Sequence, residues 1–281
     1  MQNVLQPEQP LGQHDNTTYW QPSDEWEQDR LNELHFAIKQ LYQGNLLTKA
    51  RSGICFDKNT KVLDIGCGPG TWILDMALEY DECTFIGIDL TDATFPRRRP
   101  ANAHFHVGNV LTRLPFESDT FDLVHVRLLT AALNTDEWPI ALREIMRVTK
   151  PGGLIQSLEV DLQYENDGSG IIKAMYDVCA GRGQNPRVAI EMADLLRQAG
   201  AQVIQTDARF ANTGEDSALA NRYVSVCRHS FQSLIPILAP YLKIDPEQDP
   251  EETIDTMVQS LIDCQTCWQY VANVAQKPNA P

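Results

Sequence analysis

The chain has 281 residues, of which 43% are hydrophobic, enough to bury one large α/β core or the cores of two small domains. Its net charge of −15 argues against a nucleic-acid partner, because a phosphate backbone is bound by clustered Lys and Arg. No apolar run approaches the length of a membrane span, and the N-terminus has neither the basic flank nor the apolar core of a secretory signal. We therefore expect neither a nucleic-acid nor a membrane partner.

Seven cysteines are an odd number without paired metal-ligand spacing, which predicts reduced thiols in an intracellular protein. We expect the cytoplasm, with the nucleus as an alternative location. The C-x-x-C pair of Cys264 and Cys267 leaves a redox or zinc role as the alternative to buried thiols. No metal is expected.

The N-terminal part predicts a tail followed by helix. Residues 1–18 are polar and rich in Gln, Asn and Pro, which predicts a disordered tail. An N-terminal helical flap is expected at 19–56, with Gly44 as a C-terminal helix cap. The apolar residues at helical spacing within it are Leu31, Leu34, Ile38 and Leu41.

Strand and helix patterns alternate through the middle of the chain. Strands are expected at 61–65, 84–89, 103–107, 121–127 and 154–160. Helices are expected at 71–80 and 135–148, with a broken helix at about 171–199. Such alternation is typical of a parallel sheet with helices on both faces.

The C-terminal third predicts two more strands with helices between them. The strands are expected at 203–210 and 268–274, and the helices at about 216–242 and 250–264. We therefore predict an α/β, Rossmann-like fold with a seven-stranded, mostly parallel sheet, and a helical lid inserted between the last two strands. The predicted domains are an α/β ligand-binding domain of 57–212 and 265–276 and a lid or substrate region of 213–264.

A glycine turn after the first strand is the clearest sign of function. Gly66, Gly68 and Gly70 alternate between an apolar strand and a helix start, where free N–H groups can meet a ligand. A dinucleotide fingerprint requires G-x-G-x-x-G, but Thr71 or Ile73 stands where its third glycine would be. The NAD pattern therefore fails in both frames.

Polar residues end the next two strands. Asp89 ends the second strand about 20 residues after the turn, the interval at which adenosine-binding folds place an acid on the ribose. Asn109 follows the third strand, where its amide can accept from an adenine amino group. The alternatives are a loop acid for Asp89, a turn former for Asn109 and a cap for Asp64. Because ligands of open α/β sheets bind at the strand carboxyl ends, the three positions together predict an adenosine site.

The D-x-G-x-G-x-G run of 64–70 resembles motif I of the class I S-adenosylmethionine-dependent methyltransferases. Residues 121–128 resemble motif IV of that family, and 148–153 resemble its turn before strand five. The Y-W-x-P-x-D segment that begins at Tyr19, followed by an acidic helix, resembles the fungal LaeA-like methyltransferases in particular. The likeness covers about residues 19–161, with Cys67 and Pro69 in place of two common threonines.

The resemblance implies S-adenosyl-L-methionine as cofactor and S-adenosyl-L-homocysteine as its product. It also implies a set of cofactor-binding residues, in which Tyr19 and Trp20 either close over the donor as a flap or clip the tail to the domain. These residues are Tyr19, Trp20, Asp64, Gly66, Cys67, Gly68, Gly70, Trp72, Asp89, Leu90, Asn109, Val110, Val126 and Arg127.

Four residues are candidates for catalysis. The H-x-R at the end of strand four, His125 and Arg127, and the strand-five acid Glu159 match the LaeA-like pattern, and His229 lies on the expected lid. Each histidine has a structural alternative, a satisfied imidazole. Arg127 either holds a carboxylate of donor or substrate or pairs with Asp122 or Glu144. A general base is needed only if the acceptor is a phenol or an alcohol.

We expect methyl transfer to an O, N or S atom of a small molecule, a fungal secondary metabolite, by in-line displacement. The alternative is a LaeA-like regulatory protein with a protein partner, with protein methylation or little intrinsic activity. A cyclase that keeps the cofactor is a third option. The apolar lid residues that favour a hydrophobic acceptor are Val224, Val226, Phe231, Leu234, Ile235, Ile237 and Leu238.

Overall fold

The structure is a computed structural model that describes residues 25–165, 167–245 and 247–279. The predicted tail at 1–18 lies outside the described residues, and so do Tyr19 and Trp20.

The described residues form a seven-stranded sheet with the order β3-β2-β1-β4-β5-β7-β6. Neighbouring strands among β1 to β5 are parallel, and β7 runs antiparallel to both β5 and β6. The strands are β1 (Lys61–Ile65), β2 (Thr84–Asp89), β3 (Ala103–Val107), β4 (Phe121–Arg127), β5 (Thr149–Asp161), β6 (Gln202–Asn212) and β7 (Cys267–Gln276). This arrangement confirms the predicted seven-stranded, mostly parallel sheet.

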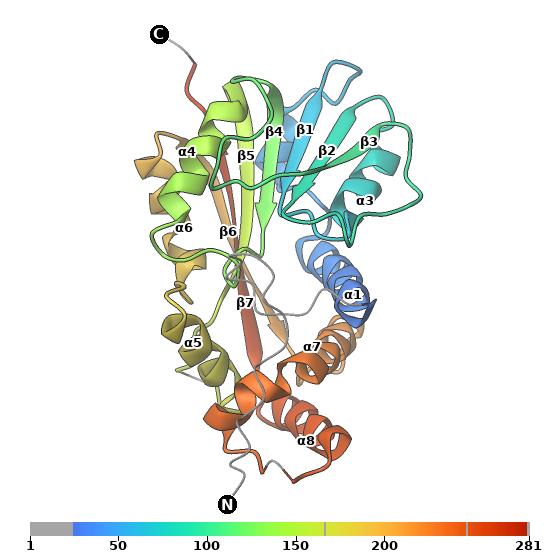
Figure 1. Cartoon of the computed structure of the whole chain (residues 1–281), viewed down its shortest axis with the longest axis vertical. Coiled ribbons are helices and arrows are strands. Elements are labelled where there is room, and N and C mark those ends of the chain that lie inside the picture. Colours follow the sequence, from blue (N-terminus) through green and yellow to red (C-terminus); the bar gives the residue numbers. More distant parts are fainter. Residues whose placement is uncertain (1–24, 166, 246, 280–281) are drawn as a thin grey trace, which may run out of the picture.

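Helices cover both faces of this sheet. Among the described residues they are α1 (Glu25–Tyr42), α2 (Thr48–Gly53), α3 (Thr71–Glu79), α4 (Trp138–Val148), α5 (Ile171–Gly181), α6 (Val188–Gln198), α7 (Ala218–Leu242) and α8 (Pro250–Asp263). Helices α4 and α6 pack side by side on one face, in a core with alternate strand residues such as Leu63 and Val124 (Figure 1). Helices α1 and α3 pack on the other face, against Val62 and Leu123. Adjacent strand residues thus point into different cores, as the pleat requires.

The helix between 171 and 199 is indeed broken, because α5 and α6 are separate helices. Two features differ from the expectation. The six-residue helix α2 was not predicted, and the 148–153 segment is mostly strand, because β5 begins at Thr149. The β4–β5 pairing shifts register at its start, and Gly152 has a φ of +76°, so a local irregularity replaces the expected turn.

Helices α7 and α8 come between β6 and β7 in the chain, where two helices were predicted. They gather at one end of the sheet, around the beginning of β7 (Figure 1). Asp249 caps α8 by accepting hydrogen bonds from the N–H groups of Glu251 and Glu252, and Pro250 occupies the first turn. Their role as a lid, the flap role of 19–56 and the domain boundaries stay predictions.

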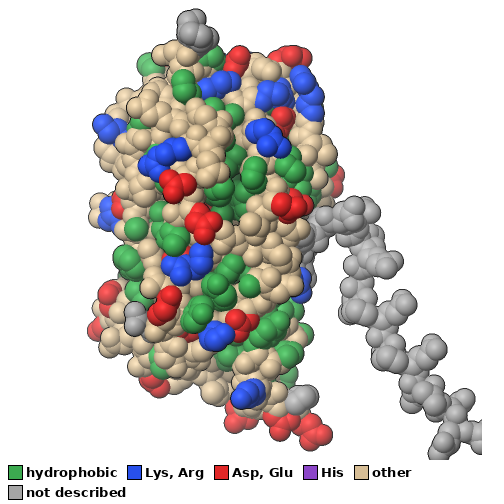
Figure 2. All heavy atoms as spheres, turned by 90° about the vertical axis from the view of Figure 1, so that its left-hand side faces the viewer, with side chains coloured by type: hydrophobic (Ala, Val, Ile, Leu, Met, Phe, Trp, Pro, Cys, Tyr) green, Lys and Arg blue, Asp and Glu red, His purple; other side chains and the backbone are tan. Residues whose placement is uncertain are grey.

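The sheet order reverses between β1 and β4, because β2 and β3 extend the sheet on one side and β4 on the other. Such a switch point opens a crevice at the carboxyl ends of the strands. On the face shown in Figure 2, acidic and basic side chains of the described residues are interspersed. None of the described helices has the length and apolar character needed to span a bilayer.

Candidate functional site

The glycine turn lies directly at the switch point. Gly66, Gly68 and Gly70 all have left-handed backbones, with φ of +67°, +52° and +74°. The N–H groups of Gly66 and Cys67 both donate to the carbonyl of Ile88, at 2.8 and 3.0 Å, which joins the turn to β2. A Cβ at Gly70 would overlap the ring of Phe105, whereas the nearest atom to one at Gly68 is 3.6 Å away. The turn therefore needs glycine at Gly70 and leaves space open at Gly68.

A cleft of about 300 Å³ opens over this turn and is walled by the ends of β1, β2, β3 and β4 and by α1. Nine of the predicted cofactor residues line it: Asp64, Gly66, Cys67, Gly68, Asp89, Leu90, Asn109, Val110 and Arg127. Gly70, Trp72 and Val126 do not line it; they lie behind it as part of the turn, helix α3 and strand β4. The strand-end residues thus come together as the topology predicts.

Asp89 connects the second strand to the turn. Its Oδ2 accepts from the N–H of Gly68 at 2.8 Å and its Oδ1 from the N–H of Leu90 at 2.7 Å. Burial raises the pKa of Asp89, and the backbone donors oppose that effect. Asn109 has a local role as well, because its Oδ1 accepts from the N–H of Leu111 at 2.8 Å. Both side chains still face the cleft with unused lone pairs.

Arg127 is the cation of the cleft wall. Its guanidinium is half-buried and has no hydrogen bond to any described residue, and burial lowers its pKa. Neither Asp122 nor Glu144, the two partners suggested for Arg127 by the sequence, pairs with it. Asp122 accepts a hydrogen bond from Lys150, and Glu144 accepts one from Arg147. A buried charge without hydrogen bonds is costly, so a guanidinium in this position favours an anionic group in the cleft.

His35 on α1 was missed by the sequence reasoning, although it lines the same cleft. It is fully buried, and its Nε2 lies 3.1 Å from Oδ2 of Asp75, while Nδ1 has no hydrogen-bond partner among the described residues. Burial lowers its pKa to about 4, so the ring is neutral at pH 7 and donates through Nε2. The sequence did offer a signal for His35. It lies one helical turn after Leu31, so both residues share the face of α1 that points to the core.

His125 lies beneath the cleft. It is buried and stacks on Trp72 with ring centroids 3.9 Å apart and planes 1° from parallel. Its Nδ1 donates to Oδ1 of Asp64 at 2.7 Å, and burial lowers its pKa. These are the surroundings of a satisfied core imidazole that orients Asp64.

His229 is a bridge between helices. Its Nδ1 lies 3.1 Å from Oε2 of Glu33 on α1, and Ser225 on α7 donates to the same carboxylate at 2.9 Å. His229 lines neither the cleft nor the cavity described below. Its contacts connect α7 to α1.

Comparison with known proteins matches residues 62–153 to the family described as "Methyltransferase domain". The match to a methyltransferase domain is confined to these residues, which run from β1 to the start of β5.

Relatives of the methyltransferase domain include fungal enzymes and regulators. The N-methyltransferase gliN of Aspergillus fumigatus is 35% identical over 144 residues, which cover 50% of each chain. The methyltransferase grgD of a Penicillium species is 33% identical over 51% of this chain and 52% of its own. The secondary metabolism regulator laeA of Coprinopsis cinerea is 31% identical over 51% of this chain and 36% of its own. The matched part thus spans about half the length of these relatives, or less, and the chain resembles the LaeA-like proteins.

Solved structures share the fold of the methyltransferase domain. The phosphoethanolamine N-methyltransferase 2 of Haemonchus contortus aligns with a TM-score of 0.52 and 17% identity, covering 88% of this chain and 57% of its own. The geranyl diphosphate C-methyltransferase of Streptomyces coelicolor aligns with a TM-score of 0.51 and 14% identity, covering 79% of this chain and 72% of its own. At these identities the likeness establishes the fold alone.

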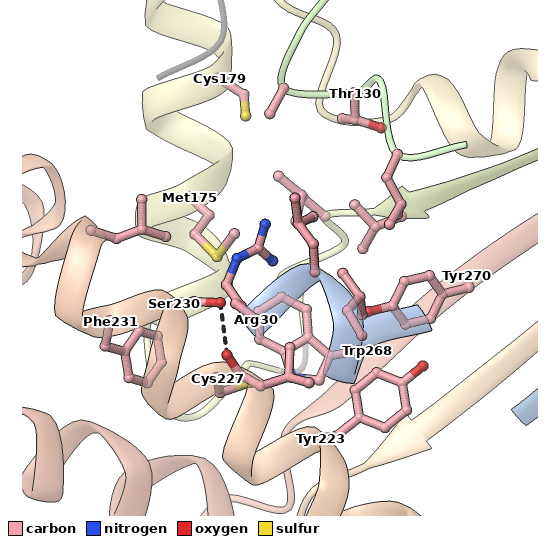
Figure 3. A pocket seen from close by; sticks show the side chains of 18 residues that line it. Arg30, Thr130, Met175, Cys179, Tyr223, Cys227, Ser230, Phe231, Trp268 and Tyr270 are labelled. Atoms are coloured by element: carbon pink, nitrogen blue, oxygen red, sulfur yellow. Dashed lines mark hydrogen bonds between the residues drawn. The ribbon is translucent and has the colours of Figure 1, made fainter. Parts of the chain in front are cut away.

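A second cavity of about 140 Å³ adjoins the cleft of the methyltransferase domain (Figure 3). Leu31, Leu34 and Leu128 line both spaces. Of the predicted apolar lid residues, Val226, Phe231 and Leu234 line this cavity, and Val224, Ile235, Ile237 and Leu238 pack in the surrounding core.

No cluster of three or more His, Cys, Asp or Glu suited to a metal occurs in the part of the chain that the structure describes. Cys264 and Cys267 are exposed free thiols.

Glu159 holds the loop that runs between the two spaces. It is fully buried, with Oε1 accepting from the N–H of Leu129 at 3.1 Å and Oε2 from the N–H and hydroxyl of Thr130 at 2.9 and 2.7 Å. The same loop contains Leu128 in a left-handed conformation, with φ of +59°. Burial raises the pKa of Glu159 from 4.5 to about 7. In this geometry Glu159 positions the loop and contacts neither space directly.

Glu159 predicts a pH-dependent stability. Because its folded pKa lies above its unfolded value, its contribution to stability is full below pH 4.5 and is lost as the pH rises through about 7. We expect wild type to lose up to about 3 kcal/mol relative to Glu159→Gln between pH 4.5 and 8, measured by urea unfolding. Glu82→Gln, which removes an exposed carboxyl, is the control. A difference between wild type and Glu159→Gln that does not vary with pH would contradict this account.

Proposed function

We propose that the chain is an S-adenosylmethionine-dependent methyltransferase that transfers a methyl group to an O, N or S atom of a small molecule, a fungal secondary metabolite. The observation that carries the proposal is the cleft at the switch point, where an open glycine turn and Asp89 meet Arg127, which has no hydrogen bond to a described residue. The matched methyltransferase family and the names of the fungal relatives support it.

The residues of the cleft fit S-adenosylmethionine as a cofactor. Its carboxylate suits the guanidinium of Arg127, and its ribose hydroxyls suit the carboxylate of Asp89. The Nδ1 of the neutral His35, which has no hydrogen-bond partner in the described part of the chain, is an acceptor for the amino group at the same end of the ligand. Asn109 and Val110 would contact the adenine. The Haemonchus and Streptomyces neighbours were solved with S-adenosyl-L-methionine and S-adenosyl-L-homocysteine, respectively.

When bound, the cofactor supplies a methyl group already activated by the positive charge of its sulfonium. The protein then has two tasks, which are to align the acceptor and to exclude water. Leu31, Leu34 and Leu128 form the apolar surface that the cleft and the second cavity share, and the buried Glu159 fixes the loop next to Leu128. Alignment of this kind can supply roughly 7–11 kcal/mol.

The side chains that line the second cavity indicate which type of acceptor atom the protein would methylate. The described residues that line it include neither a carboxylate nor an imidazole. This favours an acceptor that needs no general base, such as a neutral amine or a thiolate, over an alcohol. The relative gliN is named as an N-methyltransferase, which supports nitrogen.

A second candidate function is that of a regulatory protein in a complex, with protein methylation or little intrinsic activity. The 31% identity to a secondary metabolism regulator favours it. A cytoplasmic location accords with either function, and a nuclear location accords with the regulatory one.

Arg127→Met should separate recognition of the amino-acid end from recognition of the nucleoside. We expect binding of S-adenosylhomocysteine to weaken about 10- to 100-fold, because a hydrogen bond to a charged group is lost. Binding of 5′-methylthioadenosine, which lacks the carboxylate, should not change. Calorimetric titration measures both, with Arg197→Met on the surface of α6 as the control. An equal loss for both ligands, or no loss, would count against the assignment of Arg127.

Turnover distinguishes the two functions. Purified protein alone, incubated with S-adenosylmethionine and a panel of amines, thiols and phenols, should yield S-adenosylhomocysteine and a product heavier by one methyl in place of one hydrogen. Mass spectrometry detects both. Cofactor binding without turnover, together with a stable co-purifying partner, would favour the regulatory function, and a product of unchanged mass would indicate cyclisation.

A further inference from the structure

We propose that the second cavity holds an uncharged, ring-sized apolar part of the methyl acceptor and rejects acceptors that carry a charge there. This inference rests on the proposed function, because the cavity is assigned to the methyl acceptor only if the adjoining cleft binds the methyl donor.

The cavity has the size of one ring. Its volume is about 140 Å³. An apolar cavity of roughly 150 Å³ in another protein stays dry and binds benzene. The walls come from α1, α5, α7, β5, β7 and the loop after β4, so the cavity is lined by segments far apart in the sequence (Figure 3).

Aromatic and aliphatic side chains make most of the wall. Phe231, Trp268, Tyr223 and Tyr270 contribute rings, and the centroids of the two tyrosines lie 5.7 Å apart. Met175 adds a flexible thioether that adapts to irregular ligands. Rings of this kind favour an aromatic or cyclic group through area burial and through edge-to-face contacts.

The thiols and phenols of the wall are neutral. Burial raises the pKa of the Cys179 and Cys227 thiols to about 12, and it also raises the pKa of the Tyr223 and Tyr270 phenols. None of these groups is an anion at pH 7. Because a neutral thiol is a weak nucleophile, the two cysteines act as wall atoms and not as reactive groups.

The wall offers a charged ligand no free counter-ion. The polar atoms without a hydrogen-bond partner among the described residues of the wall, the hydroxyl of Tyr223 and Nε1 of Trp268, belong to uncharged groups. The hydroxyl of Thr130 donates to Glu159 at 2.7 Å and that of Ser230 to the carbonyl of Val226 at 2.8 Å. Arg30 is the charged side chain among the described residues of the wall, and its Nε and Nη2 each lie 2.6 Å from Glu27. A charged ligand would therefore lose its hydration without gaining a counter-ion, which is unfavourable.

Binding of three small fluorinated probes, followed by fluorine NMR, tests the proposal. Fluorobenzene should bind saturably, while 4-fluorobenzoate and 4-fluorobenzylammonium should bind at least about tenfold more weakly because their charges would be buried. Tighter binding of 4-fluorobenzoate than of fluorobenzene would overturn the proposal, because it would make Arg30 an anion site.

Two variants locate the bound probe. Met175→Trp should fill the cavity and weaken fluorobenzene binding at least about tenfold, since the added ring occupies its space. Met146→Trp is the matched control. Met146 is also half-buried, but it lies on α4 and packs in the core on the other face of the sheet. Equal effects of the two variants would contradict a site in this cavity.

Calorimetric titration with S-adenosylhomocysteine keeps the two proposals distinguishable. Undiminished binding to Met175→Trp demonstrates a folded donor cleft in that variant. A wild-type protein that binds S-adenosylhomocysteine but not fluorobenzene would overturn the cavity inference alone. A protein that binds neither ligand would overturn the proposed function as well.

Discussion

The left-handed backbone of the glycine turn is the constraint on which the rest of the site depends. Three alternate residues with positive φ reverse the chain between β1 and α3 within a few residues. This lets two consecutive N–H groups reach the carbonyl of Ile88, and it lets the N–H of Gly68 reach Asp89. The turn, the second strand and the start of α3 are thereby held as one unit. Their open side becomes the floor of the cleft.

Around that floor, buried polar groups are satisfied by partners distant in the sequence. Asp64 accepts a hydrogen bond from His125, and Asp75 accepts hydrogen bonds from His35, Lys39 and Asn45. Glu159 accepts three hydrogen bonds from the loop at 129–130. Each of these contacts fixes an element that walls the cleft or the second cavity.

Arg127 stands out against this background. Its guanidinium is half-buried at the cleft without a hydrogen bond to a described residue. Protein interiors satisfy buried polar groups almost everywhere, so an exception at a cleft indicates a ligand group that completes it. The same logic, applied to a wall without an unpaired charge, assigns the second cavity to an uncharged ligand.

Much of the fold could be predicted from the sequence, because alternating strands and helices have distinct hydrophobic periods and the glycine spacing is local. The strand-end residues Asp89 and Asn109 were predicted for the same reason, since parallel topology alone brings strand ends together. Helix α2 has too few residues to show a period. His35 was missed because its environment depends on Asp75, which is 40 residues away in the chain. The bonds of Glu159 and the stacking of His125 on Trp72 likewise arise only when distant segments fold together.

The central claim is that the open floor at Gly68 receives the methyl donor. Calorimetric titration of S-adenosylhomocysteine into Gly68→Arg tests it most directly, with Gly170→Arg as the control. Both glycines have positive φ, +52° and +73°, and both have open space where a side chain would begin. We predict that wild type and Gly170→Arg bind the ligand and that Gly68→Arg does not, while circular dichroism finds all three folded. Wild-type affinity in a folded Gly68→Arg would contradict the account.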